Sequence, residues 1–353
     1  MKQDWLTIET VDGETVLTKC SQEAEGDIVI PEGVTSIGDH AFDRCCELVS
    51  VVIPEGVTTI GGFAFDHCTQ LSSVVIPKSV RSVENDVFSH CPSLPVVDHL
   101  RYADTCLVEA VDKKLATYTI KDGTRFICSN AFCEAENMTS IVIPESVETI
   151  GLNAFSECAG LVSIKIPEHV NSIDNYAFFA CKSLTSIEIP AGIERLGVAV
   201  FSICTSLDSI RVSPDNKVYD SRENCNAIIE TASGKLIAAC RNTAFPAGIT
   251  SIEEEAFRFC DSLTSLVIPD GVAFIGSWAF SGCISLRSIY IPDSVKEIDV
   301  FAFQGCFALK SLRLPDGVKV REFAFDDCVS LSEESLERID DLFESLAVKY
   351  GVE

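Results

Sequence analysis

The chain has 353 residues, of which 47% are hydrophobic and 23% charged, and its formal net charge is −26. Such an acidic chain repels phosphate backbones and anionic lipid headgroups, which excludes nonspecific binding to nucleic acid and to anionic membranes. It contains no apolar run of about 18 residues, the length that a membrane-spanning helix needs, so no transmembrane segment is expected.

The first predicted element is a β-hairpin within residues 1–27. The segment LTIETVDGETVLTKC places two apolar runs on either side of VDGET, which is typical of two strands joined by a tight turn. We expect this hairpin to cap the N-terminal end of the fold. The N-terminus has no apolar stretch typical of a secretion signal, so we predict a cytoplasmic protein as the chain stands. The alternative is a cell-surface or secreted protein whose leader is missing from this sequence.

From residue 28 the sequence repeats itself. IPEGVTSIGDHAFDRC begins at Ile30 and IPEGVTTIGGFAFDHC at Ile53, 23 residues later. The phenylalanine of the AF phrase marks eleven copies, with a step of 23 within each block and 22 at the last: Phe42, Phe65, Phe88, Phe132, Phe155, Phe178, Phe201, Phe257, Phe280, Phe303 and Phe325. Self-similarity at this period is typical of a solenoid.

Strand alternation explains the first part of each repeat. In SVVIP, Val51 and Ile53 turn to one face and Val52 to the other, and Pro54 then ends the strand because it has no N–H to donate. A single coil cannot bury its apolar face alone. Coils stacked about 4.8 Å apart turn each repeat column into a ladder of similar side chains.

The phrase IPxxVxxIxxxAFxxC resembles the BspA-like, Treponema-type leucine-rich repeats, and it recurs over nearly the whole chain. The resemblance implies a β-rich α/β solenoid over residues 28–331. This would be a right-handed leucine-rich-repeat superhelix with a parallel sheet and about eleven 23-residue coils. It also implies a protein-interaction role, since some members of the family act as surface adhesins.

Two stretches interrupt the period, at about residues 95–120 and 211–243. CLVEAVDKKLATY begins at Cys106 and NAIIETASGKLIAAC ends at Cys240, and each has two apolar runs around a short turn. We therefore predict two β-hairpin islands within the solenoid. A structural role in curvature and a functional role as loops both remain open.

Residues 332–353 change to helical spacing. Apolar side chains three or four positions apart predict an amphipathic helix, with Ser332 as its N-cap: Leu336, Ile339, Leu342, Phe343 and Leu346. We expect this helix to cap the last coil, because an open solenoid end exposes core and unpaired strand edges. A helix that docks on a partner is the alternative.

Ten of the seventeen cysteines occupy one repeat column, three residues after the marker phenylalanine and three before a leucine: Cys45, Cys68, Cys91, Cys158, Cys181, Cys204, Cys260, Cys283, Cys306 and Cys328. This spacing predicts that they face the core as small hydrophobes. Side chains in register point the same way, a poor match to disulfide geometry, so reduced thiols are expected. They fit a reducing compartment better than an oxidising one.

Nothing in the sequence predicts catalysis, a cofactor or a metal. The chain has neither a G-x-S-x-G motif nor a phosphate-binding glycine loop. His67 and His90 share a column in adjacent coils, but the cysteine after each should point inward, which leaves no evident third ligand. We therefore predict a protein that is not an enzyme and has no cofactor.

The outward face of the strands is the predicted binding surface. One outward column is serine nine times, whereas the column two residues before the proline varies: Val29, Val52, Val75, Val142, Lys165, Glu188, Arg211, Val267, Tyr290 and Arg313. Variation at exposed positions on a fixed scaffold is what recognition requires. The first three should form an apolar stripe, and Tyr290 beside Arg313 is a candidate contact pair.

The function predicted from these observations is a non-enzymatic scaffold that binds a protein partner, still to be identified, across the strand face. The alternative is a bacterial cell-surface adhesin that binds host matrix protein or glycan. The solenoid alone supplies an extended surface and does not choose between them.

Overall fold

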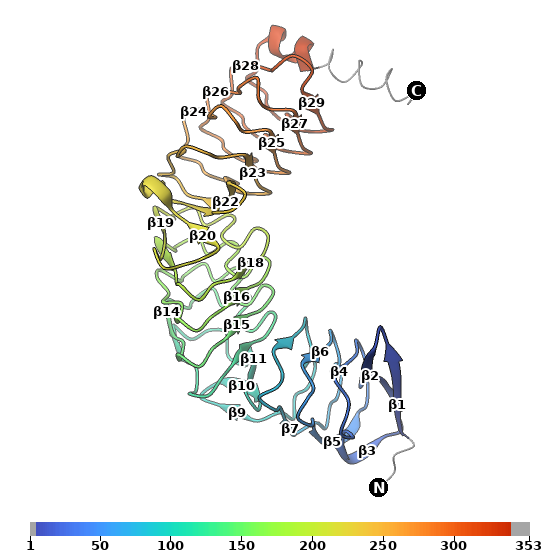
Figure 1. Cartoon of the computed structure of the whole chain (residues 1–353). Helices are drawn as coiled ribbons and strands as arrows, with labels where there is room; N and C mark the ends of the chain where they lie inside the picture. The colour runs from blue at the N-terminus through green and yellow to red at the C-terminus, as the bar shows by residue number, and fades with distance from the viewer. Residues whose placement is uncertain (1–4, 340–353) are drawn as a thin grey trace. The chain divides into compact units, whose positions relative to one another are not determined.

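The computed structural model describes residues 5–339, which fall into two compact units (Figure 1). Of the described residues, 5–156 and 169–177 belong to unit 1, and 157–168 and 178–339 belong to unit 2. Both are built from stacked coils with short parallel strands, so the predicted β-solenoid is confirmed. There are about 13 turns rather than eleven, because the strands of the hairpins also stack against the coils.

Unit 1 opens with the predicted hairpin. β1 (Leu6–Val11) and β2 (Glu14–Cys20) pair antiparallel across a turn at Asp12 and Gly13, both of which have left-handed φ values, 51° and 86°. β2 then pairs in parallel with β4 (Ser36–Ile37). The hairpin thus provides a strand partner for the first coil, so that the edge of β4 that faces the N-terminus is paired.

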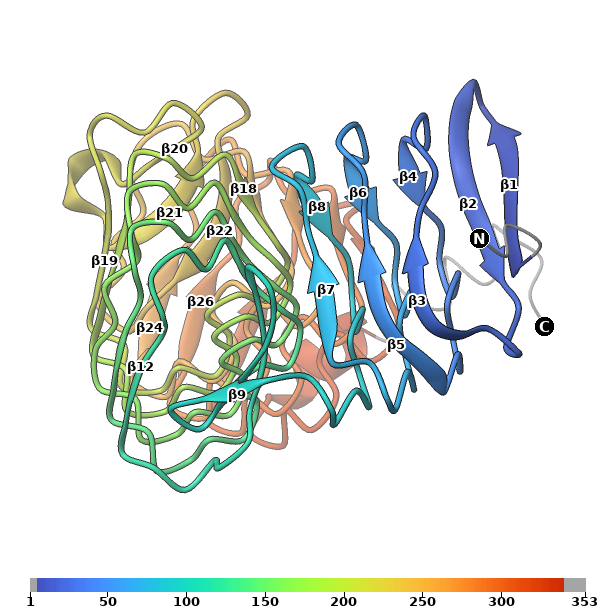
Figure 2. The ribbon, with the colours of Figure 1, turned by 90° about the horizontal axis from the view of Figure 1, so that it is seen from below.

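Two sets of strands continue through the first coils. One is β4, β6 (Thr59–Ile60) and β8 (Ser82–Val83). The other, which forms the strand face, is β3 (Glu25–Val29), β5 (Glu47–Val52) and β7 (Ser73–Val75), visible side by side in Figure 2. Ser50 pairs with Ser73, and Val52 with Val75, so the register advances by the repeat length.

The first island is also a hairpin. β10 (Leu100–Ala103) pairs antiparallel with β9 (Val96–Val97) and with β11 (Cys106–Ala110). β11 pairs in parallel with β13 (Phe126–Ile127), followed by β15 (Thr149–Ile150) and β16 (Ser172–Ile173). On the strand face, β12 (Thr117–Thr119) pairs with β14 (Ser140–Val142).

Unit 2 repeats this plan. Its strand face has β17 (Ser186–Ile189) paired with β19 (Ser209–Val212), and β24 (Ser265–Val267), β26 (Ser288–Tyr290) and β28 (Ser311–Arg313) paired in that order. β18 (Arg195–Leu196) lies in the coil between β17 and β19. The second island contains β20 (Tyr219–Asp220), the 3-10 turn η2 (Arg222–Asn224), β21 (Ala227–Glu230) and β22 (Lys235–Ala239). β22 leads into β23 (Ser251–Ile252), β25 (Phe274–Ile275), β27 (Glu297–Ile298) and β29 (Lys319–Val320).

The marker phenylalanines form the centre of the core. In unit 2, the rings of Phe257, Phe280, Phe303 and Phe325 stack with successive centroid distances of 4.9, 5.0 and 5.1 Å. The spacing is that of adjacent strands. Each ring therefore fills the layer of its own coil, and Phe280 and Phe303 each contact the ring above and the ring below.

The cysteine column faces the core as predicted, and none of the cysteines, all of which lie within residues 5–339, forms a disulfide. A detail that the sequence did not indicate is that the thiol hydrogen-bonds to the preceding coil: Cys68 Sγ lies 3.1 Å from the carbonyl oxygen of Phe42, and Cys283 Sγ 3.2 Å from that of Phe257. Cys260 also packs against the core, but it is only partly buried. The segment before its coil is the second hairpin island rather than a regular repeat.

The predicted C-terminal helix begins after Ser332, and residues 333–339 are helical. Ser332 Oγ accepts the N–H of Ser335 at 3.3 Å, which confirms the N-cap. The inward position is occupied by Ser335 and Ile339, whereas Leu336 is 46% exposed, so the prediction that Leu336 faces inward is wrong. Leu342, Phe343 and Leu346 lie outside the described residues.

Ser335 faces inward because it completes the last strand. Its Oγ accepts the N–H of Leu312 at 3.2 Å, at the open edge of β28. A leucine there would leave that N–H without an acceptor. Between residues 5 and 339, no helix has the length and apolarity that a bilayer crossing requires.

Candidate functional site on the strand face

All ten side chains of the predicted binding column are exposed. They lie at outward positions because the strands alternate: beneath Val29, Val52 and Val75, the neighbouring residues Ile28 and Val51 point into the core. The three valines are aligned in register across β3, β5 and β7 and form an apolar stripe in unit 1. Val142 lies on β14, opposite Thr119 of β12.

In unit 2 the same column becomes charged. Glu188 on β17 is paired in register with Arg211 on β19. Together with Lys165 they line a groove of about 490 Å³ whose other lining residues include Glu168 and the pair Ser186 and Ser209. Lys165 belongs to a coil segment outside the strands. The groove therefore offers charges of both signs beside a row of hydroxyl groups.

Three further residues of the predicted column lie on the next strands of unit 2. Val267 on β24, Tyr290 on β26 and Arg313 on β28 are paired in register. The Arg313 guanidinium is 3.0 Å from Asp293 Oδ1, but both side chains are largely exposed. Such a pair contributes little to stability. The guanidinium thus remains accessible beside the aromatic ring of Tyr290, which is 44% exposed.

The surface around Arg313 extends to the C-terminal helix. A cavity of about 640 Å³ is lined by Arg313, Leu312, Glu334, Glu337 and Arg338, among others. Arg338 lies 2.6 Å from Asp316 Oδ1. The predicted surface lacks these helix residues, because helical spacing indicates which side chains face inward and gives no information on what the outward ones face.

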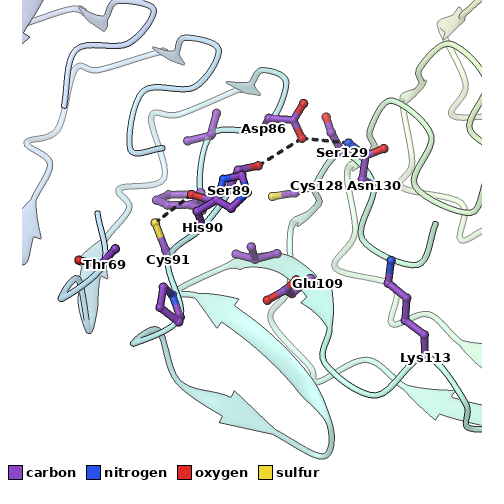
Figure 3. Close-up of a pocket in the computed structure, with 14 residues that line it drawn as sticks. Thr69, Asp86, Ser89, His90, Cys91, Glu109, Lys113, Cys128, Ser129 and Asn130 are labelled. Carbon is purple, nitrogen blue, oxygen red and sulfur yellow. Dashed lines mark hydrogen bonds between the residues drawn. The ribbon is translucent and has the colours of Figure 1, made fainter. Parts of the chain in front are cut away.

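Unit 1 has a further cavity, of about 500 Å³, between the coil that follows β8 and the first hairpin island (Figure 3). Its polar groups are bonded to one another: Asp86 Oδ1 accepts from Asn130 Nδ2 at 2.9 Å, and Ser129 Oγ donates to Asn85 Oδ1 at 3.2 Å. Burial raises the pKa of the Cys91 thiol to about 12. That thiol therefore stays protonated at neutral pH and is a poor nucleophile.

One sequence prediction about ligands is wrong. We expected His67 and His90 to lack a third partner, but Asp66 Oδ1 lies 2.9 Å from the Nδ1 atom of each imidazole. Aspartate at this position carries no sequence signal of its own. Its role depends on where the coil turns, which the repeat pattern does not define.

Exposed side chains of different character stand in register on a regular strand face, and the cavities near them contain hydroxyl, carboxylate and guanidinium groups. The repeat profile described as "BspA type Leucine rich repeat region (6 copies)" matches residues 15–103, 112–233 and 235–344. The chain belongs to the BspA-type leucine-rich repeat family. The resemblance inferred from the IPxxVxxIxxxAFxxC phrase is therefore confirmed, and the chain is a leucine-rich-repeat scaffold.

Two solved structures of leucine-rich repeat proteins are similar to this chain. A leucine rich cell surface protein from Faecalibacterium prausnitzii A2-165 is 28% identical, with a TM-score of 0.57, over 94% of this chain and 87% of that one. A leucine-rich repeat protein from Bacteroides ovatus ATCC 8483 is 27% identical, with a TM-score of 0.41, over 94% of this chain and 92% of the other. No curated protein matches the chain.

Proposed function

We propose that this BspA-type protein is a non-enzymatic scaffold that recognises a protein partner through the strand face of its solenoid. The observation that carries the proposal is the contrast between two outward columns. One presents serine after serine, as in Ser265, Ser288 and Ser311, whereas the neighbouring column presents Val267, Tyr290 and Arg313 in the same register. Changing side chains on a constant backbone provide a specific surface without altering the fold.

The region around Tyr290 and Arg313 is the centre of the proposed surface. Tyrosine and arginine are enriched among residues that dominate binding energy, because each combines a large contact area with a polar end. Apolar surface from Val267 lies on one side, and the charged cavity beside the C-terminal helix lies on the other. A protein partner with an apolar contact flanked by charged groups of both signs fits this arrangement.

A cell-surface adhesin is the second candidate. It is favoured by the likeness to the Faecalibacterium prausnitzii protein, which is described as a cell surface protein. The burial of the cysteine column as small hydrophobes favours a reducing compartment instead. Alkylation of the protein from its native cells without reductant, followed by mass spectrometry, separates the two. If nearly all cysteines are alkylated after denaturation, the cytoplasmic scaffold is supported. If several cysteines are paired in disulfides, the adhesin is supported.

Site-specific photo-crosslinking in the native cells tests the proposal. A photoreactive side chain is introduced at Tyr290 or Glu188, and as a control at Phe323, which is 54% exposed but lies in a coil outside the strand face. We expect a defined crosslinked protein from the first two positions and not from the third. The same adduct from Phe323, or adducts from Phe323 alone, would overturn the proposal.

A further inference from the structure

The Asp66 carboxylate lies between two imidazoles from adjacent coils. Its Oδ1 atom is 2.9 Å from Nδ1 of His67 and 2.9 Å from Nδ1 of His90. The two rings are stacked, with their centroids 4.1 Å apart and their planes 20° from parallel. One oxygen and two nitrogens thus converge, and all three ligand atoms lie within 4.8 Å of one another.

The backbone holds these side chains in place. His67 and His90 occupy the same position of successive coils, with left-handed φ values of 55° and 56°. The N–H of His67 donates to the carbonyl oxygen of Ser89 at 3.0 Å, and that of Asp66 to the carbonyl oxygen of Phe63 at 3.0 Å. The convergence therefore follows from the stacking of the coils and requires no rearrangement of the chain.

Ordinary hydrogen bonding does not account for both contacts. The contact of His90 Nδ1 with Asp66 has hydrogen-bond geometry. His67 Nδ1, in contrast, is buried and has no hydrogen-bond partner, although it is equally close to the same oxygen. A buried ring nitrogen whose only polar contact is this ion pair, without hydrogen-bond geometry, is poorly satisfied. A cation between the three atoms would satisfy it.

We propose that Asp66, His67 and His90 bind a divalent transition-metal cation of the zinc class, through one carboxylate oxygen and the two Nδ1 atoms. Imidazole together with carboxylate suits Zn²⁺, Co²⁺ and Ni²⁺, whereas Ca²⁺ and Mg²⁺ take oxygen ligands. Three protein ligands leave a fourth tetrahedral position for water. The cation would join the coil of His67 to the coil of His90.

The two distances from Asp66 to the histidines fit such an ion after a small adjustment. Tetrahedral zinc with bonds of about 2.0–2.2 Å holds its ligand atoms about 3.4 Å apart. The Asp66 contacts need to open by a few tenths of an ångström, which the His90 side chain permits because it is 66% exposed. The thiols nearby are engaged elsewhere: Cys91 Sγ donates to the Phe65 carbonyl oxygen and Cys46 Sγ to that of His67. The site is therefore a nitrogen and oxygen site.

Titration of the full chain with Co²⁺ under reducing conditions tests the proposal, because the cobalt spectrum distinguishes nitrogen and oxygen ligands from thiolates. We expect one equivalent to bind without a thiolate-to-cobalt charge-transfer band. Asp66→Asn, His67→Gln and His90→Gln should each lower the affinity at least tenfold. The matched control is His169→Gln, since His169 also lies near a carboxylate, 4.0 Å from that of Glu145, but is not part of the three-residue group.

Thermal unfolding gives a second readout that does not depend on spectra. A cation that binds only the folded chain raises the melting temperature. We expect Zn²⁺ to raise the melting temperature of the wild type and of His169→Gln but not that of Asp66→Asn. Equal melting temperatures of the three proteins in chelator would show that the variants fold. Equal cobalt affinity in wild type and Asp66→Asn, a thiolate band, or an equal zinc shift in all variants would overturn the proposal.

Discussion

Replacement of Phe280 by alanine tests whether the aromatic ladder holds the coils together. Phe280 is completely buried, and its ring stacks on Phe257 and Phe303. Truncation of a buried phenylalanine costs about 3–5 kcal/mol through lost burial and the cavity left behind. Each aromatic contact contributes about 0.5–1.5 kcal/mol beyond the buried area. With two such contacts, we expect Phe280→Ala to lie in the upper half of that range.

Two other variants calibrate this value. Phe325 is the last ring of the ladder, stacks on Phe303 and is 8% exposed, so Phe325→Ala should cost about 1 kcal/mol less than Phe280→Ala. Tyr290 is 44% exposed, and Tyr290→Ala should cost under about 0.5 kcal/mol. The contrast separates core positions from the proposed binding surface within the same unit.

Urea unfolding followed by tryptophan fluorescence measures these differences. Trp278 lies two residues before Phe280, and a Trp5→Phe background makes it the sole tryptophan. A probe in the same coil is needed because solenoids unfold through neighbouring repeats. Equal destabilisation by Phe280→Ala and Tyr290→Ala would refute the assignment of the two faces. A larger loss for Phe325→Ala than for Phe280→Ala would refute the stacking argument.

Three further predictions concern single interactions. Burial raises the pKa of the Cys283 thiol to about 12, so this thiol loses its proton at lower pH in the unfolded chain than in the folded one. Its contribution to the free energy of unfolding should be full below about pH 8.5 and should fall as the pH rises toward 12. In urea unfolding, Cys283→Ala should therefore weaken the fall of the midpoint with pH. Ser335→Ala removes the buried acceptor of the Leu312 N–H and should cost about 1–3 kcal/mol in the same assay; no loss would contradict the edge-closing role. Gly282→Ala adds a Cβ 2.7 Å from the Phe259 ring at a φ of +72° and should lower the free energy of unfolding by about 1 kcal/mol or more. Adding Phe259→Ala removes the clash and should restore part of that loss; no recovery would contradict the clash.

The repeat pattern predicted the core and the outward column because both follow from strand alternation and a fixed period. Knowing that Val51 faces inward places Val52 outward, and the same holds one repeat later. The marker phenylalanine identifies a buried layer wherever it recurs. The fold and the orientation of the strand side chains were therefore predictable from residues alone.

Other features depend on geometry that the period does not define. Ser335 takes the inward position expected for Leu336 because the Leu312 N–H at the open strand edge needs a hydrogen-bond acceptor. The spacing of hydrophobic residues gives no information about this requirement. Asp66 meets His67 and His90 because the coil adopts left-handed backbone angles there. The cavity beside the first island arises where a hairpin replaces a regular coil, and nothing in its sequence marks the space that it leaves.

The most direct test of strand-face recognition is side-chain footprinting by hydroxyl radicals, with and without the protein captured by crosslinking. If the partner binds the strand face, Val267 and Tyr290 lose reactivity in the complex. Phe307 and Phe323, which are 49% and 54% exposed in coils outside the strand face, keep their reactivity. Protection of Phe307 and Phe323 with Val267 and Tyr290 unchanged would contradict strand-face recognition.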